Sequence, residues 1–299
     1  MPIQRPSPED VKDFRPLDEL IPEHWTSGDV NTFDGTRIHY TRTGGDKPAL
    51  ILLHGVQVDG LSWLRTAQAF EADYDVVMPD ARGHGQSNGL ENGLSSSLQI
   101  MDLVSVIYAL RLDRPFVVGH SMGADIAARL AAAHPLRAVV LVDPALQNLA
   151  AMMPPVGDEK PPWMQSLFDT MTALKTQTHA ERMVTGLNLL PPGTELWHEA
   201  DYVSFVYGQA QFDLSVFQHM RELGYVFEEP NLIARIACPI LLLTARQMMS
   251  PDSAPDISAF SDHWQQGQHI HFPDSGHAIY CDQFERFVTT VREFLAAQG

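Results

Sequence analysis

Ser121 is the residue whose surroundings most clearly indicate chemistry. It lies in the stretch "VVGHSMGAD", where Gly119 and Gly123 flank it at two residues on either side, after an apolar run and before an alanine-rich segment. A serine at a sharp turn from strand to helix projects its hydroxyl from the sheet edge, and flanking glycines remove the Cβ atoms that would clash there. The following helix N-terminus stabilises negative charge. We therefore predict that Ser121 is a nucleophile.

His277 is the predicted general base. It lies in the glycine-containing stretch "DSGHA", just before the last helix-like segment. A neutral imidazole with a pKa of about 6.5 can take a proton from a serine hydroxyl and return it to a leaving group. We interpret His54, His84 and His120 as structural residues, with His120 also a candidate for the lining of a substrate pocket.

The stretch "LLHGVQVDG" predicts the site of an oxyanion hole. Its chain turns at Gly55, so the backbone N–H of Val56 is expected to face the same point as the backbone N–H of Met122. A pair of such donors stabilises the negative charge that develops during acyl transfer. Gln57 is a candidate for a further polar contact in the pocket, or alternatively a solvated turn residue.

These residues must be positioned by an α/β fold. Apolar runs of strand length recur at 49–55, 74–80, 115–121, 138–144 and 239–245, and helix-like segments lie between them. This alternation predicts a doubly wound, mostly parallel sheet. We predict an N-terminal arm at 1–25, a core formed by 26–145 and 230–299, and a helical cap at 146–229 that interrupts the alternation. Trp163 in this cap is a candidate pocket residue, because the segment is rich in methionine and aromatic side chains.

The motifs together resemble the α/β-hydrolase superfamily, in the branch of serine hydrolases with a helical lid. The matching parts are His54-Gly55, "DARGHGQS" at 80–87, the turn around Ser121 and "SGHA" at 275–278. The resemblance implies an eight-stranded sheet, with the lid inserted after the sixth strand. It also implies a catalytic triad in the chain order serine, acid, histidine.

The position of the acid is the open question. In many members of the superfamily, Gly-x-x-Asp follows the strand that corresponds to 239–245, but here the last of these positions holds Met248. Asp143, at the end of the run "AVVLV", is the first candidate, because the resemblance permits an acid at that strand end. Asp252 is the second candidate, and the third possibility is a chain without this acid. Met248 and Met249 would then be pocket or core residues.

Composition limits the classes of function. The formal net charge of -17 disfavours binding to nucleic acid or to an anionic membrane. No apolar run is long enough to span a bilayer, and the polar, proline-rich first residues predict no secretion signal. The chain has 2 cysteines and no Cys/His cluster with ligand spacing, so we expect a cytoplasmic protein without a metal or other cofactor. The sequence leaves the oligomeric state open.

The leading hypothesis is a serine hydrolase that cleaves a small-molecule carboxylic ester or lactone through an acyl-enzyme, with an apolar and bulky substrate. Cleavage of an amide or of a carbon–carbon bond, and perhydrolysis, use the same triad and remain alternatives. A second class is a ligand-binding protein with little or no turnover on the same scaffold, which the methionine at position 248 motivates.

Overall fold

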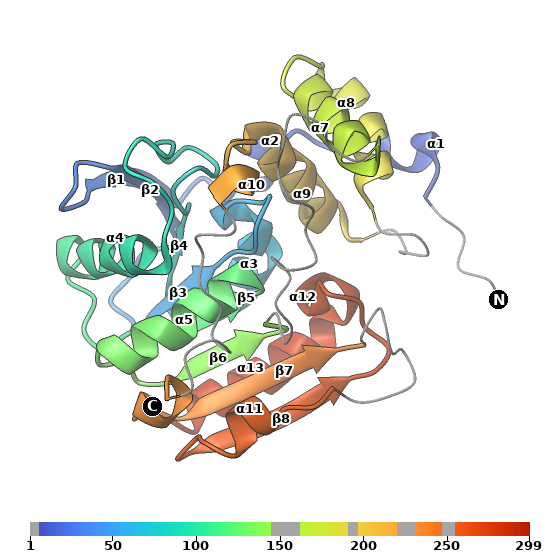
Figure 1. The fold of residues 1–299 in the computed structure, drawn as a ribbon. Coiled ribbons are helices and arrows are strands. Elements are labelled where there is room, and N and C mark those ends of the chain that lie inside the picture. The colour runs from blue at the N-terminus through green and yellow to red at the C-terminus, as the bar shows by residue number, and fades with distance from the viewer. Residues whose placement is uncertain (1–5, 145–161, 191–196, 220–230, 247–254) are drawn as a thin grey trace.

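The computed structural model describes residues 6–144, 162–190, 197–219, 231–246 and 255–299. Its centre is an eight-stranded sheet with the order β1-β2-β4-β3-β5-β6-β7-β8 (Figure 1). The strands are β1 (Thr26–Asn31), β2 (Arg37–Arg42), β3 (Ala49–Leu53), β4 (Asp75–Pro79), β5 (Phe116–His120), β6 (Val139–Val142), β7 (Ile240–Ala245) and β8 (Gly267–Phe272). Neighbours from β4 to β8 pair in parallel, and β2 pairs antiparallel with β1 and β4. The predicted mostly parallel sheet is confirmed.

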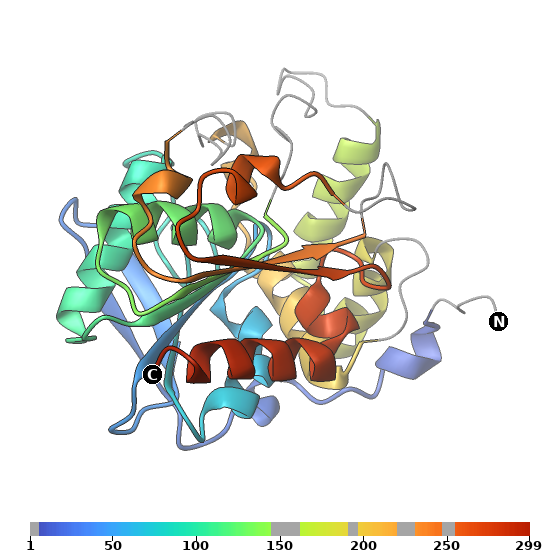
Figure 2. The ribbon, with the colours of Figure 1, turned by 90° about the horizontal axis from the view of Figure 1, so that it is seen from below.

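Helices cover both faces of the sheet, which explains why its central strands are continuous apolar runs (Figure 2). Every residue of β3 is buried, and successive residues pack into opposite layers: Leu50 and Leu52 on one side, Ile51 and Leu53 on the other. The first layer contains α3 (Leu64–Phe70) and α13 (Phe284–Ala296), and the second contains α4 (Ser96–Ala109) and α5 (Met122–Ala133). The short α11 (Ser258–Ser261) lies on the side of α4 and α5.

The N-terminal arm, for which the sequence predicted no regular elements, is partly helical in its described residues. It contains two one-turn helices, α1 (Pro8–Val11) and α2 (Leu17–Leu20). Proline is well suited to a first helical position, and Ser7 and Asp10 form a capping box around it. Asp-Gly between two strand-like runs favours a tight turn with positive φ, which predicts a hairpin at Asp34-Gly35. The structure confirms it: this turn joins β1 and β2, with Gly35 at φ 84°.

The described residues between β6 and β7 form helices, which lie beyond the sheet edge where the parallel strands end (Figure 1). We call them the inserted helices: α7 (Pro162–Leu174), α8 (His179–Gly186), the 3₁₀ turn η2 (Leu187–Leu189), α9 (Glu199–Gln211) and α10 (Val216–His219). Helix α9 contacts α3 and the 3₁₀ turn η1 (Gly60–Trp63), so the inserted helices rest on the loop that follows β3. No helix in the described ranges is long and apolar enough to cross a membrane.

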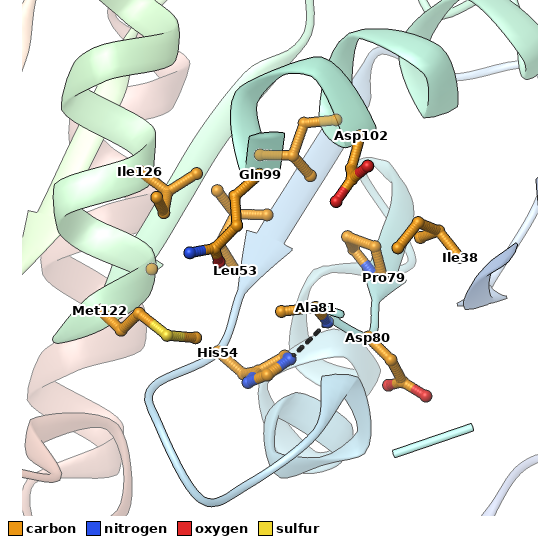
Figure 3. Close-up of a pocket in the computed structure, with 12 residues that line it drawn as sticks. Ile38, Leu53, His54, Pro79, Asp80, Ala81, Gln99, Asp102, Met122 and Ile126 are labelled. Carbon is orange, nitrogen blue, oxygen red and sulfur yellow. Dashed lines mark hydrogen bonds between the residues drawn. The ribbon is translucent and has the colours of Figure 1, made fainter. Parts of the chain in front are cut away.

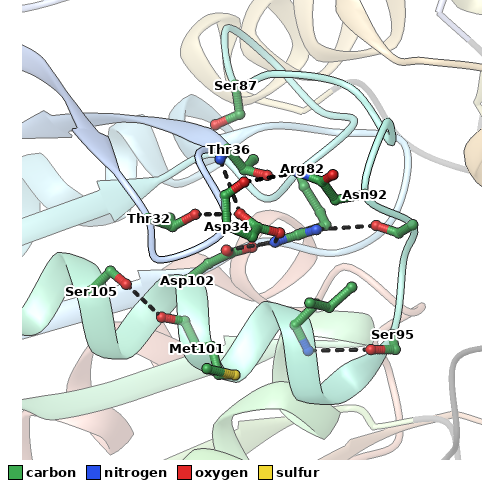
Figure 4. A network of polar contacts seen from close by, with 12 residues as sticks. Thr32, Asp34, Thr36, Arg82, Ser87, Asn92, Ser95, Met101, Asp102 and Ser105 are labelled. Carbon is green, nitrogen blue, oxygen red and sulfur yellow. Dashed lines mark hydrogen bonds and ion pairs between the residues drawn. The ribbon is translucent and has the colours of Figure 1, made fainter.

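A buried arginine fixes the loop after β4. Arg82 is fully buried, and its guanidinium forms two hydrogen bonds to Asp102 of α4, at 2.7 and 2.8 Å (Figure 4). It also pairs with Asp34 at 3.2 Å and donates to the carbonyl of Gly93 at 3.1 Å. These contacts join the "DARGHGQS" motif to the β1–β2 hairpin and to α4. Carboxylates that are removed from water are stabilised by such a cation, so both Asp34 and Asp102 depend on Arg82.

The variant Arg82→Met leaves two carboxylates beside an apolar side chain, and we expect it to lower the free energy of unfolding by about 3–5 kcal/mol. Lys12→Met is the control, because Lys12 pairs with Glu9 at the surface and such pairs contribute at most about 1 kcal/mol. Urea denaturation measures both. An equal decrease in the free energy of unfolding for the two variants would contradict the role assigned to the Arg82 network.

Candidate active site

The backbone at Ser121 is held in a strained turn between β5 and α5. Ser121 has φ 53° and ψ -114°, and its N–H donates to the carbonyl of Val142 at 3.0 Å. A Cβ atom at Gly119 would lie 2.1 Å from the carbonyl oxygen of Gly123, and one at Gly123 would lie 2.3 Å from the carbonyl oxygen of Leu53. Because backbone atoms occupy both places, only glycine fits, and the serine is presented at the first turn of α5.

Asp143 lies directly beside His277. Its Oδ2 is 2.6 Å from Nδ1 of His277, and its Oδ1 accepts a hydrogen bond of 2.8 Å from the backbone N–H of Ala245. Asp143 follows β6 with φ 44°, and its own N–H donates to Leu243 of β7. An ionised carboxylate accepts at both oxygens, so Nδ1 of His277 carries the proton and Nε2 has a free lone pair.

His120 joins the serine turn to the histidine loop, defined as residues 275–277. Its Nε2 lies 2.9 Å from the carbonyl oxygen of His277, and the two rings have centroids 4.5 Å apart. Burial, and secondarily the neighbouring His277, lowers the pKa of His120 well below its usual range. His120 is therefore a neutral donor to the histidine loop. Since Ser121 is the next residue along the chain, this contact brings the backbones of Ser121 and His277 together.

His54 orients the peptide expected to supply an oxyanion donor. Its Nε2 accepts from the N–H of Ala81 at 2.9 Å, so the proton is on Nδ1, which donates to the carbonyl of Gly55 at 2.7 Å. The described residues contain no cis peptide, so the N–H of Val56 points opposite to that carbonyl. Burial lowers the pKa of His54 to about 4, which keeps this arrangement intact at neutral pH.

The loop after β3 packs closely on the serine turn. A Cβ atom at Gly55 would lie 2.9 Å from Nδ1 of His120 and 3.4 Å from Cβ of Ser121. The amides of Val56 and Met122 therefore belong to backbone segments that lie on either side of this contact. Gln57, the next loop residue, is half-buried and has φ 71°.

The remaining candidates differ in where they lie. Trp163 is the second residue of α7 and is 55% exposed, and no contact between it and Ser121, Asp143 or His277 is seen. Asp252, Met248 and Met249 lie outside the described residues. The choice between the two aspartates therefore depends on the geometry of Asp143 alone.

A small cavity lies between the end of β3, the loop after β4, and helices α4 and α5 (Figure 3). Its volume is about 30 Å³, and its lining includes Met122, His54, Gln99 and Ile126 but neither Ser121 nor His277. Pockets for organic ligands are typically on the order of 300 Å³ or larger. This cavity is too small to hold an ester or lactone together with its reacting carbonyl.

Two residues beside the histidine loop were not singled out by the motifs. Asp282, in α12 (Ile279–Asp282), accepts a hydrogen bond from the N–H of Gly276, and Trp197 donates its indole N–H to the same carboxylate, each at 2.8 Å. The only signal for Asp282 in the sequence is an acid five residues after His277. Acids near the start of a helix are common for electrostatic reasons, so that signal does not identify its partners.

The described residues contain no group of three or more His, Cys, Asp and Glu side chains that could hold a metal ion. The two cysteines are free thiols, Cys238 and Cys281, and both are partly buried.

Comparison with known proteins defines the class. Residues 50–290 match the Alpha/beta hydrolase family, so the chain belongs to that family. The fold agrees with solved structures: an esterase from Rhodococcus sp. ECU1013 gives a TM-score of 0.67 at 23% identity, covering 91% of this chain and 99% of that one. N-formylmaleamic acid deformylase from Pseudomonas putida S16 gives a TM-score of 0.69 at 22% identity, covering 89% of this chain and 100% of that one.

Among curated sequences, the chain is similar to N-formylmaleamate deformylase of Pseudomonas putida, with 36% identity over 118 residues, 38% of this chain and 44% of that protein. It is also 36% identical over 125 residues to 2-hydroxy-6-oxononadienedioate/2-hydroxy-6-oxononatrienedioate hydrolase of Paraburkholderia phymatum, covering 39% of this chain and 43% of that protein. The chain thus spans less than half the length of these relatives.

The variant Gly123→Ala tests the steric basis of the serine turn. Its Cβ would press on the carbonyl of Leu53, so we expect a loss of about 1–3 kcal/mol or more of unfolding free energy, or no folded protein. Gly89→Ala is the control, because the nearest atoms to its Cβ would be 3.4 Å away. Thermal denaturation compares the two. A Gly123→Ala protein as stable as Gly89→Ala would show that the turn does not require glycine there.

Proposed function

We propose that this protein is a serine hydrolase that cleaves a carboxylic ester or lactone through a covalent acyl-enzyme, with Ser121, His277 and Asp143 as the catalytic triad. The observation that carries the proposal is the 2.6 Å contact between Asp143 and His277, beside the strained turn that presents Ser121. It supports Asp143 as the acid in a chain with a methionine at position 248, because Asp143, which follows β6, lies at Nδ1 of the histidine.

In the first half of the reaction, Nε2 of His277 takes the hydroxyl proton of Ser121 as Oγ attacks the substrate carbonyl. The N–H groups of Val56 and Met122 stabilise the resulting oxyanion. Asp143 keeps the imidazole in the required tautomer and stabilises its positive charge. Collapse of the tetrahedral intermediate breaks the bond to the leaving alcohol, which receives the proton from His277.

In the second half, His277 takes a proton from water, whose oxygen attacks the acyl carbonyl. The second tetrahedral intermediate collapses, Ser121 regains its proton from His277, and the carboxylic acid leaves. A lactone gives one product that carries both the acid and the alcohol, and an ester gives two products. Each cycle consumes one water and requires no oxidant, metal or other cofactor.

The inserted helices follow Asp143 in sequence, and we propose that this region acts as a cap that helps to form an apolar substrate pocket, to which Gln57, His120 and Trp163 are candidates to contribute. The net charge of -17 disfavours nucleic-acid and anionic-membrane partners and so supports a small-molecule substrate. The 2 cysteines, too few for a disulfide framework, support a cytoplasmic location. The names of the two curated relatives, a deformylase and a hydrolase of oxo-dienedioates, support hydrolysis of amide or carbon–carbon bonds as the second candidate function.

Steady-state kinetics on a 4-nitrophenyl ester test the proposal. We expect turnover by the wild type, loss of turnover in Ser121→Ala, and a decrease in kcat on the order of 10⁴-fold in Asp143→Asn, because the amide stabilises neither the tautomer nor the imidazolium. Asp46→Asn, an exposed change of the same kind, should equal the wild type.

Two outcomes would contradict the proposal. An Asp143→Asn variant with near wild-type kcat would show that another group, such as Asp252, supplies the acid. A wild type that binds esters without Ser121-dependent turnover, and likewise fails with amides and with carbon–carbon bonds next to a ketone, would favour the ligand-binding alternative.

A further inference from the structure

The histidine loop is held at three successive peptide groups. The carboxylate of Asp282 accepts the N–H of Gly276, and the hydroxyl of Ser275 donates to the carbonyl of Gly276 at 2.9 Å. The next carbonyl, that of His277, accepts from His120. The side chain of His277 is 52% exposed, so burial does not fix its position. These backbone contacts and the bond to Asp143 are what determine where its Nε2 lies.

The Asp282 carboxylate also reaches the inserted helices. Its Oδ2 accepts from Gly276, and its Oδ1 accepts from the indole N–H of Trp197 at 2.8 Å. Trp197 lies two residues before α9 and packs edge-on against Phe205 of that helix, with ring centroids 5.4 Å apart. One carboxylate therefore bridges the loop that carries His277 and the segment that leads into α9.

The surroundings of Asp282 make this bridge depend on its hydrogen bonds. Burial raises the pKa of Asp282, and the donors Trp197, Gly276 and Ser275, together with the charge of His277, oppose that rise. The nearby cation, Arg65 of α3, pairs instead with Asp201 of α9 at 3.1 Å and lies 3.5 Å from the ring centroid of Phe284. The Asp282 carboxylate is thus oriented by neutral donors on two different parts of the chain.

Two further titratable groups face the same space. Burial, offset only in part by Arg65, raises the pKa of Asp201 to about 7, and burial raises the pKa of the Cys281 thiol. The negative charge of the nearby Asp282 adds to the rise in the pKa of Asp201. No ion pair to Asp282 is found among the described residues. Its carboxylate instead accepts hydrogen bonds from the N–H of Gly276, from the indole N–H of Trp197 and, at 3.4 Å, from the hydroxyl of Ser275.

We propose that Asp282 is a positioning residue for the reaction, and that its hydrogen bond from Trp197 makes the placement of His277 depend on the seating of α9 against the core. The inference rests on the proposed function, because it concerns the same histidine. When Trp197 is in place, Asp282 is held between its two donors and Gly276 is fixed. When the indole N–H is removed, the carboxylate loses one donor and the histidine loop gains freedom, with the substrate contacts unchanged.

A misplacement of about 1 Å of a catalytic group costs on the order of 10²-fold in rate. We therefore expect Asp282→Ala to lower kcat by about 10²-fold on a 4-nitrophenyl ester with little change in KM. Asp282→Asn should recover part of the lost kcat. Its single amide oxygen still accepts a hydrogen bond from either Gly276 or Trp197. Trp197→Phe keeps the aromatic packing on Phe205 and removes only the donor, and should lower kcat several-fold.

The controls match each change. Trp264→Phe alters a tryptophan that packs on Gly267 at β8, and Asp46→Asn alters an exposed aspartate; both should equal the wild type in kcat and KM. Thermal denaturation of each variant establishes that it is folded at the assay temperature. If Asp282→Ala does not fold, the milder Trp197→Phe decides the question.

A folded Trp197→Phe with wild-type kcat would overturn the coupling to α9, and a folded Asp282→Ala with wild-type kcat would overturn the positioning role. A rise in KM with constant kcat would also overturn it, since it would place these residues in substrate binding. These results require turnover that Ser121→Ala abolishes. Turnover that survives in Ser121→Ala would instead overturn the proposed function, and this inference with it.

Discussion

The parallel register of β5, β6, β7 and β8 is the constraint on which the site depends. Adjacent parallel strands end at one edge of the sheet, so residues that follow them meet there although they are far apart in sequence. Ser121 follows β5, Asp143 follows β6, and His277 lies in the loop after β8. The close packing of Gly119 and Gly123 against neighbouring backbone then sets the height of the serine above this edge.

The strand β7, after which Met248 stands in place of the usual acid, still contributes to the proposed triad. Ala245 ends β7 and donates its N–H to Oδ1 of Asp143, which leaves Oδ2 for His277. Asp143 is thus oriented by the very strand end that carries the acid in many members of the family. An acid after β6 can reach the same imidazole because β6 and β7 are neighbours, with Val142 paired to Leu243. An acid after β6 instead of β7 changes which strand end supplies the negative charge beside the imidazole. The roles proposed for Ser121 and His277 stay the same.

The sequence pattern of neighbouring residues was sufficient to predict those elements whose conformation neighbouring residues determine. The central strands, the Asp34-Gly35 hairpin and the glycine-flanked turn at Ser121 each follow from neighbouring residues, and the sheet confirms the first two. The helical turns near the N-terminus were missed because four-residue elements have no periodicity to detect. The contact of Asp282 with Trp197 spans 85 positions in the chain, and no local signal reports such a distance.

The central claim is that Ser121 is an activated nucleophile, and covalent labelling with a fluorophosphonate tests it most directly. The reagent reacts with a serine only where a base and oxyanion donors lower the barrier to attack. Peptide mapping by mass spectrometry should find the label on Ser121 in the wild-type protein and on no residue in Ser121→Ala. An unlabelled wild type, or a label on another residue that persists in Ser121→Ala, would contradict the account.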